Sequence, residues 1–475
     1  MIDIKKISSI YFAGIGGIGM SALARYFNEQ GVKVSGYDKT ETPLTKNLME
    51  EGIAIHFEDD VKLLDKSADV IVYTPAIPAT HRELNFYKEN NYTLLKRSDV
   101  LGLLTADTFN ICVAGTHGKT TTSAMIAHIL KDSGYGCNAF LGGIAANYDT
   151  NFWAAPIMLE GSTNKVSVVE ADEYDRSFLK LNPDVAIITA MDADHLDIYG
   201  TEENMQDAFI QFTERIKKDG CLIVKKGLKR IDEFKVADTC TYSFEDATAN
   251  IHIDNLEIIN GAYQFNLINN FWTINGVILN MGGLHNIENV MAAIAVAKYL
   301  EIDNGKIKAA VASFKGVKRR FEFVLRSPAP HVRVGEGLIM IDDYAHHPEE
   351  LRALITGAKN LFPGKKCTVI FQPHLFSRTK DLADGFAEVL SLADETILLP
   401  IYPARELPMP GVTSELILEK MTNQDKKILD KNELLEYLRS CKVFSAEGFR
   451  DALIITAGAG DIDTLIEPIK NILEN

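Results

Sequence analysis

The chain has 475 residues, of which 46% are hydrophobic and 24% charged, and a formal net charge of −16. At roughly 150 residues per domain this length predicts about three domains, with enough apolar material for several cores. The acidic balance argues against nucleic acid or an anionic membrane surface as a partner. It leaves nucleotides open, because local loops bind them even in an acidic protein.

The cysteine pattern and the amino terminus indicate a compartment. The six cysteines are scattered and include no C-x-x-C pair, which favours reduced thiols over a disulfide framework or a zinc site. The first residues lead into an apolar strand without a signal-peptide pattern, and no uninterrupted apolar stretch is long enough to span a membrane. We therefore expect a cytoplasmic protein.

The first pattern along the chain is a strand, a glycine-rich loop and a helix. Residues 10–13 are apolar, G-I-G-G-I-G follows at Gly14–Gly19, and residues 20–30 have helical spacing before a second strand that ends at Asp38. In dinucleotide-binding folds such a helix points its amino terminus at a pyrophosphate, and the acid contacts a ribose. The pattern favours a phosphate-bearing ligand over tight packing alone, without saying which ligand.

A third apolar segment, residues 69–73, predicts another parallel strand, and Thr74 begins the loop after it. Ligands of open α/β sheets bind at the carboxyl ends of strands, so we expect this loop to line the same site as the glycine loop. The first domain is expected to end near Ala106.

The sequence G-T-H-G-K-T-T-T at Gly115–Thr122 is the strongest local signal. It follows the apolar residues 109–113 and opens onto a helical pattern at residues 123–131. This is the layout of a phosphate-binding P-loop, in which Lys119 reaches the β- and γ-phosphates and the Thr120 hydroxyl ligates Mg²⁺. One departure is a valine where the usual pattern has its first glycine.

Two predicted strands beside the P-loop end in carboxylates. Residues 166–169 precede the acidic run E-A-D-E-Y-D that starts at Glu170, and residues 185–189 precede D-A-D-H-L-D, which contains His195. Each run alone is typical of a solvated surface turn. Together with a P-loop, they have the arrangement that holds Mg²⁺ against phosphate oxygens.

Two further segments of the central region have helical or strand periodicity. Residues 203–218 predict an amphipathic helix, and residues 262–279 alternate as in a hairpin. A long alanine-rich helix then begins with G-G-L-H-N-I-E-N. Its Asn286 and Asn289 either cap the helix or offer the donor and acceptor pair that recognises an adenine edge. The basic segment at residues 318–320 is either solvated or brings an arginine to a phosphoryl group.

The last third again alternates strand and helix. Strands are expected near residues 338–342, 367–372, 394–400 and 452–457, and their ends carry D-D-Y-A-H-H-P, Q-P-H-L-F-S-R-T, P-I-Y-P-A-R-E and G-A-G-D. Polar and aromatic clusters at the carboxyl ends of parallel strands describe the rim of a binding crevice. The histidines lack a third ligand at suitable spacing, so we expect no metal there.

The order of these motifs resembles that of the Mur ligase family. The matching segments are GIGGIG, GTHGKTTT, EADEYDRSFL, DADHLDIYG, GLHNIENVMAA, KRRFE, DDYAHHP, FQPHLFSRT and GAGD. A P-loop without its first glycine is that family's own form. The resemblance implies an α/β fold of three domains: an N-terminal Rossmann-like domain for a UDP-sugar (1–106), a central P-loop ATPase with a mostly parallel sheet (107–321), and a C-terminal Rossmann-like domain that brings the amino acid (322–475).

Within this family the chain is most similar to the branch that adds L-alanine to UDP-N-acetylmuramate. The resemblance implies an ATP-dependent amide ligase of cytoplasmic peptidoglycan synthesis. ATP phosphorylates the lactyl carboxylate of the sugar, the alanine amine attacks the acyl phosphate, and phosphate leaves. The implied cofactors are ATP and two Mg²⁺ ions, or Mn²⁺ in their place. We expect a monomer or weak homodimer that needs no nucleic acid and no membrane.

The resemblance also assigns residue roles. The implied catalytic residues are Lys119, Glu170, His195 and Arg320. The implied ATP-binding residues are Gly115, Thr116, His117, Gly118, Lys119, Thr120, Thr121, Asn286, Asn289, Arg320 and Asp343. The implied UDP-sugar residues are Gly14, Gly16, Gly17, Gly19, Asp38 and Thr74. The implied amino-acid residues are Tyr344, His346, His374 and Arg378. Thr120 and Glu170 would hold one metal ion and His195 a second.

Three departures and three alternatives accompany this resemblance. Residues 209–212 occupy the region where many relatives have a carbamylated lysine, which agrees with the alanine-adding branch. Leu375 stands where FQPHLFSRT often has arginine, which puts one substrate contact in doubt. Tyr174 within EADEYD resembles the pattern of the recycling ligase, which adds a tripeptide to the same sugar. That ligase is the main alternative function. A nicotinamide-dependent oxidoreductase would leave the P-loop without a role, and a non-catalytic ATPase would leave the last domain without one.

Overall fold

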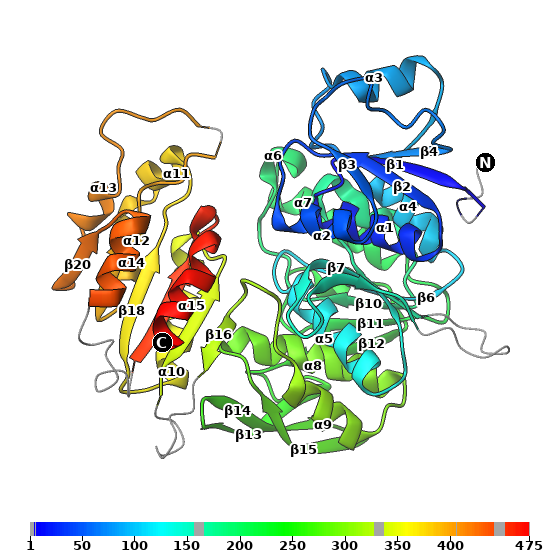
Figure 1. Ribbon diagram of the computed structural model, residues 1–475. Helices are drawn as coiled ribbons and strands as arrows, with labels where there is room; N and C mark the ends of the chain where they lie inside the picture. The colour runs from blue at the N-terminus through cyan, green and yellow to red at the C-terminus, as the bar shows by residue number, and fades with distance from the viewer. Residues whose placement is uncertain are drawn as a thin grey trace. The chain divides into compact units, whose positions relative to one another are not determined.

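The computed structural model contains three sheets flanked by helices (Figure 1). It describes residue 4 and residues 6–155, 166–326, 337–404, 406–440 and 452–474. The chain forms two compact units. Unit 1 comprises residues 1–254, 267–275 and 288–311, and unit 2 comprises residues 255–266, 276–287 and 312–475. The expected domain boundaries at residues 106 and 321 stay predictions. Among the described residues, no helix has the length and apolar character needed to cross a membrane.

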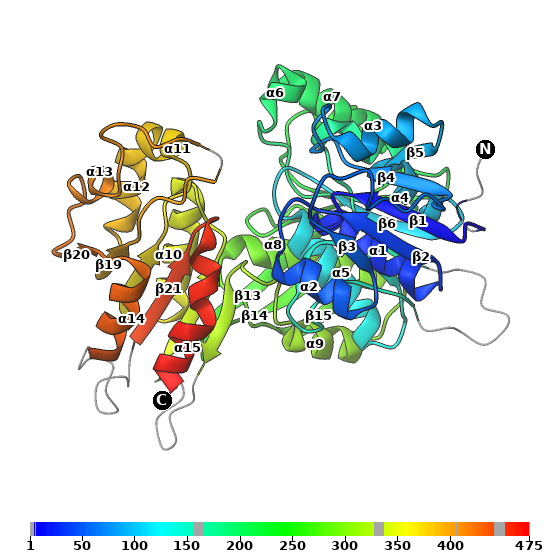
Figure 2. The ribbon, with the colours of Figure 1, turned by 45° about the horizontal axis from the view of Figure 1, so that its top comes forward.

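The first sheet belongs to unit 1 and is entirely parallel, in the order β3-β2-β1-β4-β5. Its strands are β1 (Ser9–Ala13), β2 (Lys33–Tyr37), β3 (Ala54–His56), β4 (Val70–Tyr73) and β5 (Thr93–Lys96). The accompanying helices are α1 (Ile18–Glu29), α2 (Pro43–Glu50), α3 (Arg82–Glu89) and α4 (Arg97–Thr105). Figure 2 shows β4, β1 and β2 side by side. The order in which successive strands are added reverses between β1 and β4, which makes this the topological switch point of the sheet. The glycine loop and the Thr74 loop follow these two strands, and ligands of such sheets bind at this point.

The second sheet has ten strands, in the order β15-β14-β13-β12-β11-β10-β6-β9-β7-β8. The strands are β6 (Phe109–Ala114), β7 (Asn138–Ala145), β8 (Thr150–Trp153), β9 (Val166–Glu170), β10 (Val185–Ile188), β11 (Cys221–Lys225), β12 (Asp238–Ser243), β13 (Ile251–Ile259), β14 (Ala262–Asn269) and β15 (Trp272–Leu279). From β7 to β12 the neighbouring strands are parallel, whereas β8 is antiparallel to β7. The expected hairpin at residues 262–279 is therefore the β14–β15 edge of the main sheet.

The helices that follow these strands are α5 (Lys119–Asp132), α6 (Leu196–Tyr199), α7 (Glu202–Thr213), α8 (Leu284–Tyr299) and α9 (Asn304–Ser313), with short 3₁₀ turns at Tyr174–Lys180 and Ile231–Glu233. The helix expected at residues 203–218 is shorter than predicted. It ends at Thr213 because the Lys217 backbone N–H donates to the Pro183 carbonyl, at 2.9 Å, and its ammonium pairs with Asp184 at 2.7 Å.

The third sheet lies in unit 2, in the order β16-β17-β21-β18-β19-β20, and is parallel except for β16. Its strands are β16 (Glu322–Arg326), β17 (Ile339–Asp343), β18 (Lys366–Phe371), β19 (Glu395–Leu398), β20 (Asp425–Ile428) and β21 (Ala452–Ala457). Its helices are α10 (Pro348–Leu361), α11 (Phe376–Asp381), α12 (Ala383–Leu390), α13 (Glu415–Leu418), α14 (Lys431–Ser440) and α15 (Ile466–Glu474), with a 3₁₀ turn at Asp461–Leu465. Leucines of α14 and Ile469 of α15 pack in one core cluster with alternate strand residues such as Ile370 and Ile454. All four expected strands are present.

Inside unit 1 the β7–β8 hairpin packs against α1 and joins the first two sheets into one core. The ring of Tyr26 on α1 lies 5.7 Å from that of Phe140 and 5.9 Å from that of Phe152. The fully buried Asn151 accepts a hydrogen bond from Arg25 at 2.5 Å and donates to the Ile18 carbonyl. Apolar packing and buried polar bonds together hold the hairpin to α1.

Candidate active site

The P-loop connects β6 to α5 and requires two of its glycines. Gly115 and Gly118 have positive φ angles, of 136° and 82°. A Cβ on Gly115 would lie 2.2 Å from the Thr189 hydroxyl oxygen, and one on Gly118 would lie 2.6 Å from the amide oxygen of Asn289. No side chain caps the amino terminus of α5. The first backbone N–H groups of the helix therefore remain for an anion.

The next strand along the sheet, β10, fixes the course of the loop. The Thr116 N–H donates to the Ala190 carbonyl at 3.1 Å, and the Thr116 hydroxyl accepts from the Asp192 N–H at 3.1 Å. The Thr189 hydroxyl donates to the His117 carbonyl. Thr116 and His117 thus contribute to the loop through its backbone geometry, while the His117 ring itself is largely exposed.

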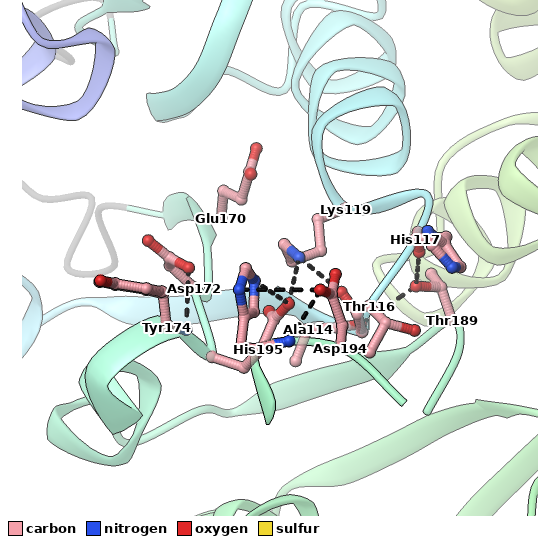
Figure 3. Close-up of polar contacts among 12 residues, drawn as sticks. Ala114, Thr116, His117, Lys119, Glu170, Asp172, Tyr174, Thr189, Asp194 and His195 are labelled. Carbon is pink, nitrogen blue, oxygen red and sulfur yellow. Dashed lines mark hydrogen bonds and ion pairs between the residues drawn. The ribbon is translucent and has the colours of Figure 1, made fainter. Parts of the chain in front are cut away.

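Lys119 is held by a buried carboxylate. Its ammonium donates to the Gly115 carbonyl and to Oε1 of Glu173, each at 2.7 Å. Glu173 is fully buried, whereas the Lys119 side chain is 14% exposed. The Lys119 ammonium and the His195 Nε2 lie 2.7 Å and 3.7 Å from this same Glu173 oxygen, and Figure 3 shows the Lys119 and His195 side chains close to one another. The Glu173 carboxylate therefore neutralises the charge of Lys119.

Glu173 is a functional candidate that sequence analysis did not single out. The His195 Nε2 lies 3.7 Å from its Oε1, and the Tyr199 hydroxyl donates to its backbone carbonyl at 2.6 Å. Its other carboxylate oxygen is buried and has no hydrogen-bond partner within the described parts of the chain. Glu173, Asp194 and His195 place ligand atoms within 4.8 Å of one another, so these three residues could hold a cation.

The predicted pair Thr120 and Glu170 is brought together. The Thr120 hydroxyl donates to Oε1 of Glu170 at 3.1 Å, and the Gly142 N–H donates to Oε2 at 3.1 Å. Glu170 ends β9 while Thr120 lies in the first turn of α5. His195 belongs to the Glu173 group and makes no contact with Glu170 among the described residues.

A cavity of about 490 Å³ in unit 1 contains several predicted residues. Gly17, Gly19 and Thr74 line it on the side of the first sheet, and Glu170 lines it on the side of the second. The other predicted UDP-sugar residues shape the glycine loop from outside the cavity. Asp38 accepts the Gly16 N–H at 2.8 Å, and Gly14, with φ of 87°, packs against Thr74.

The two asparagines of α8 lie on its first turns and are buried. In unit 1, the Asn289 amide oxygen accepts from the Thr122 hydroxyl at 3.2 Å, beside the P-loop. In unit 2, the Asn286 amide donates to the Gly282 carbonyl at 2.6 Å. The Asn286 bond is not an N-cap bond, because its amide nitrogen donates to a carbonyl instead of its oxygen accepting a helix N–H. Capping and adenine recognition both stay predictions, and Asn289 lies beside the phosphate loop.

In unit 2, Arg319 and Arg320 have different environments. Arg319 donates to Asp342 at 3.1 Å and to the Gly458 carbonyl at 2.6 Å. Arg320 is exposed, and its guanidinium has no hydrogen bond with the residues that the structure describes. Asp343 accepts two backbone N–H groups at 2.6 and 2.7 Å. Burial, with the Asp342 charge adding to it, raises the pKa of Asp343 to about 7 against the opposing effect of these hydrogen bonds.

The four predicted amino-acid residues form a row at the carboxyl edge of the third sheet. Ring centroids of Tyr344 and His346 are 5.2 Å apart, and those of His346 and His374 are 6.2 Å apart. Nδ1 of His374 and Nη1 of Arg378 are buried and have no hydrogen-bond partner among the residues that the structure describes. Burial and the positive charges of Arg378 and His346 lower the pKa of His374. Leu375, which stands where the family pattern often has arginine, has φ of 68° and is the N-cap residue of α11.

A P-loop beside strand-end carboxylates, set among three α/β sheets, is the arrangement of an ATP-using ligase fold, and three family models match in the same order. They are the Mur ligase family catalytic domain at residues 9–108, the Mur ligase middle domain at 113–297, and the Mur ligase glutamate ligase domain at 319–460. The chain belongs to the Mur ligase family. The expected three-domain α/β fold is confirmed by these models and by the solved structure described next.

Individual relatives show which branch of the family the chain is similar to. The chain is 45% identical to the UDP-N-acetylmuramate–L-alanine ligase of Flavobacterium johnsoniae over 476 residues, 99% of each chain. It is also 45% identical to the enzyme of that name from Parabacteroides distasonis over 478 residues, covering 99% of this chain and 98% of the other. The crystal structure of UDP-N-acetylmuramate-alanine ligase from Thermotoga maritima matches with a TM-score of 0.80 and 27% identity, over 98% of both chains.

Proposed function

We propose that the chain joins L-alanine to the lactyl carboxylate of UDP-N-acetylmuramate, with ATP as the energy source and ADP and phosphate as the other products. The observation that carries this proposal is the cavity in which the glycine loop of the first sheet faces Glu170 beside the P-loop. The full-length similarity to L-alanine ligases supports the choice of substrates. Because ATP and a sugar nucleotide are its substrates, we place the reaction in the cytoplasm, in peptidoglycan precursor synthesis.

The P-loop residues fit ATP and Mg²⁺. Gly115 and Gly118 form a cradle that a Cβ would fill, at the uncapped start of α5. The Thr120 hydroxyl and the Glu170 carboxylate are hard oxygen donors 3.1 Å apart, suited to one Mg²⁺. The Glu173 and His195 group is suited to a second ion, with Mn²⁺ acceptable in either place. Bound Mg²⁺ would supply positive charge where the γ-phosphate and a carboxylate repel one another.

The chemistry then proceeds in two transfers. A lactyl carboxylate oxygen attacks the γ-phosphorus, ADP leaves, and an acyl phosphate forms. The alanine amine attacks the acyl carbon, the C–O bond to phosphate breaks, and the amine loses its proton. In the first transfer Lys119 exchanges Glu173 for the transferring phosphoryl group, whose charge it stabilises. Excluding water from the acyl phosphate preserves it for the amine.

We assign the residues of unit 2 and α8 by the same logic. Arg378 binds the alanine carboxylate, because its buried Nη1 has no partner among the described residues and its planar guanidinium matches a carboxylate. Tyr344, His346 and His374 line that amino-acid site. Further ATP contacts are assigned to Asn286 and Asn289 at the adenine, Asp343 at the ribose and Arg320 at a phosphate. We expect a monomer or weak homodimer in solution.

Phosphate release with Mg-ATP and UDP-N-acetylmuramate tests the proposal. Release that requires both the sugar nucleotide and L-alanine supports it, with Glu170→Ala as the inactive control. Dependence on the tripeptide alone would assign the chain to the recycling reaction, in which Tyr174, a lining residue of the cavity, would contact the tripeptide. Release indifferent to both substrates would indicate a bare ATPase and contradict the assignments in unit 2.

A further inference from the structure

The cavity beside Glu170 is lined by more acidic than basic side chains, which is unusual for a site that binds an anionic ligand. Its acidic lining residues are Glu170, Asp172 and Asp175, and its cationic lining residues are Lys96 and Arg97. A sugar nucleotide would add at least two further negative charges with its diphosphate. These two cations are therefore the side chains on the cavity wall that can attract such a ligand, and both lie at the junction of β5 and α4.

Arg97 lies directly against the glycine loop. A Cβ added to Gly19 would be 2.7 Å from its Nη1 and 3.3 Å from its Cζ. Gly19 lies in the first turn of α1, whose amino-terminal residue Gly17 provides no side-chain cap. The guanidinium thus faces the point at which the loop and the helix amino terminus present backbone N–H groups to a phosphate-bearing ligand.

Asp172 orients the Arg97 guanidinium but occupies only part of its hydrogen-bonding capacity. Its Nη2 donates to Oδ2 of Asp172 at 3.2 Å, and the side chain is 22% exposed. Its Nε and Nη1 make no hydrogen bond with the residues that the structure describes. Because arginine has five N–H donors in a rigid fork, Asp172 can hold one edge while another edge meets phosphate oxygens.

Lys96 is a weaker candidate for direct contact. Its ammonium lies 3.2 Å from Asp175, and its side chain is 44% exposed, twice the exposure of Arg97. A flexible, solvated ammonium adds attraction to the cavity but fixes no geometry.

We infer that Arg97 is the side chain that binds the diphosphate of the sugar nucleotide, opposite the glycine loop. This inference deepens the proposed function and rests on it. It adds to the glycine loop a residue from a different strand end, 78 positions further along the chain from Gly19. Discrimination between a sugar nucleotide and an uncharged sugar then depends on this guanidinium.

Calorimetric titration of the full chain with UDP-N-acetylmuramate, without ATP, tests the inference. Arg97→Ala should raise the Kd roughly 10- to 100-fold, the loss typical of hydrogen bonds to charged groups. Arg97→Lys keeps the charge and loses the fork, so its loss should be smaller. Arg82→Ala removes an exposed arginine at the start of α3, which does not line the cavity, and should leave the Kd unchanged.

Competing ligands locate the contact. UDP should lose affinity for Arg97→Ala by about the same factor as the sugar nucleotide, whereas uridine should not. ATP affinity should stay at the wild-type value, which shows that the variant is folded. An unchanged Kd for Arg97→Ala would overturn the inference alone, and so would equal losses for UDP and uridine. A wild-type chain that fails to bind the sugar nucleotide would overturn the proposed function and the inference together.

Discussion

The carboxyl edges of the second and third sheets are equipped in opposite ways. At the P-loop edge the cation Lys119 is already paired with the buried Glu173, and the other oxygen of this carboxylate has no hydrogen-bond partner among the described residues. At the edge of the third sheet, Nη1 of Arg378 and Nδ1 of His374 have no hydrogen-bond partner in the part of the chain that the structure describes. Buried polar atoms without partners cost free energy, so each edge retains a specific deficit.

The sign of each deficit indicates what the edge binds. An unpaired carboxylate oxygen at the P-loop attracts cations, and the lysine becomes available for a phosphate only when Glu173 finds another partner. A buried guanidinium such as that of Arg378 attracts an anion such as a carboxylate. One edge therefore rearranges its own charges on binding, whereas the other is completed by its ligand.

The largest expected effect comes from Lys119→Ala, which should lower turnover roughly 1000-fold or more by removing charge stabilisation from the transferring phosphoryl group. The protein should fold but lose about 3 kcal/mol of unfolding free energy, because Glu173 keeps a buried charge without its lysine. Phosphate release and thermal unfolding measure the two effects. Adding Glu173→Gln should restore stability and leave activity absent; recovery of both would contradict the assignment of Lys119.

The next effect tests the edge of the third sheet. Arg378→Ala should raise the KM for L-alanine roughly 100-fold, because the carboxylate loses a charged donor pair. Steady-state kinetics should show the KM for ATP within about twofold of wild type. Arg378→Lys should be intermediate. A higher KM for ATP with an unchanged KM for alanine would move Arg378 to the nucleotide.

A smaller effect separates the two roles of Glu173. Glu173→Gln should tighten ADP binding in EDTA by roughly 5- to 10-fold, because Lys119 no longer has to leave a carboxylate, while turnover with Mg²⁺ falls. Asp192→Asn, an exposed carboxylate at the same edge, is the matched control. Weaker ADP binding in Glu173→Gln would show that the carboxylate supports the loop rather than competing for the lysine.

The smallest effect concerns the pH dependence of stability. Burial and the charges of Arg378 and His346 lower the pKa of His374 below its usual 6.5. Between the lowered value and 6.5 the unfolded chain binds a proton that the folded chain does not, so the unfolding free energy rises with pH over this interval and is lost as pH falls. Denaturant titrations should show a flatter profile for His374→Gln. An identical profile would mean that His374 is not titrating there.

Local sequence patterns were sufficient to predict much of the secondary structure and part of the candidate site. The P-loop, the glycine loop and the strands around them follow from apolar runs next to glycines, and Thr120 and Glu170 meet as predicted. The short strands β3 and β5 escaped prediction because their residues are half exposed and give no apolar run.

The sequence patterns did not predict which side chains from distant segments meet at the site. The run after β9 offers three carboxylates besides Glu170, and nothing in their order says that Glu173 turns inward. That outcome depends on the following turn, where Asp175 and Arg176 have φ angles of 53° and 54°. Arg97 is likewise a single arginine without a motif, and only the meeting of α4 with α1 places it over Gly19.

The β7–β8 hairpin sets a limit on how this chain can be recombined with others. Asn151 and the aromatic rings of the hairpin belong, by sequence, to the segment after the P-loop, yet they complete the packing of α1. A chimera cut at residue 106 would graft a glycine loop whose helix has lost Arg25's buried partner. Exchange of a sugar-recognition module between homologues would therefore have to transplant residues 138–153 as well, which makes the inherited module discontinuous in sequence.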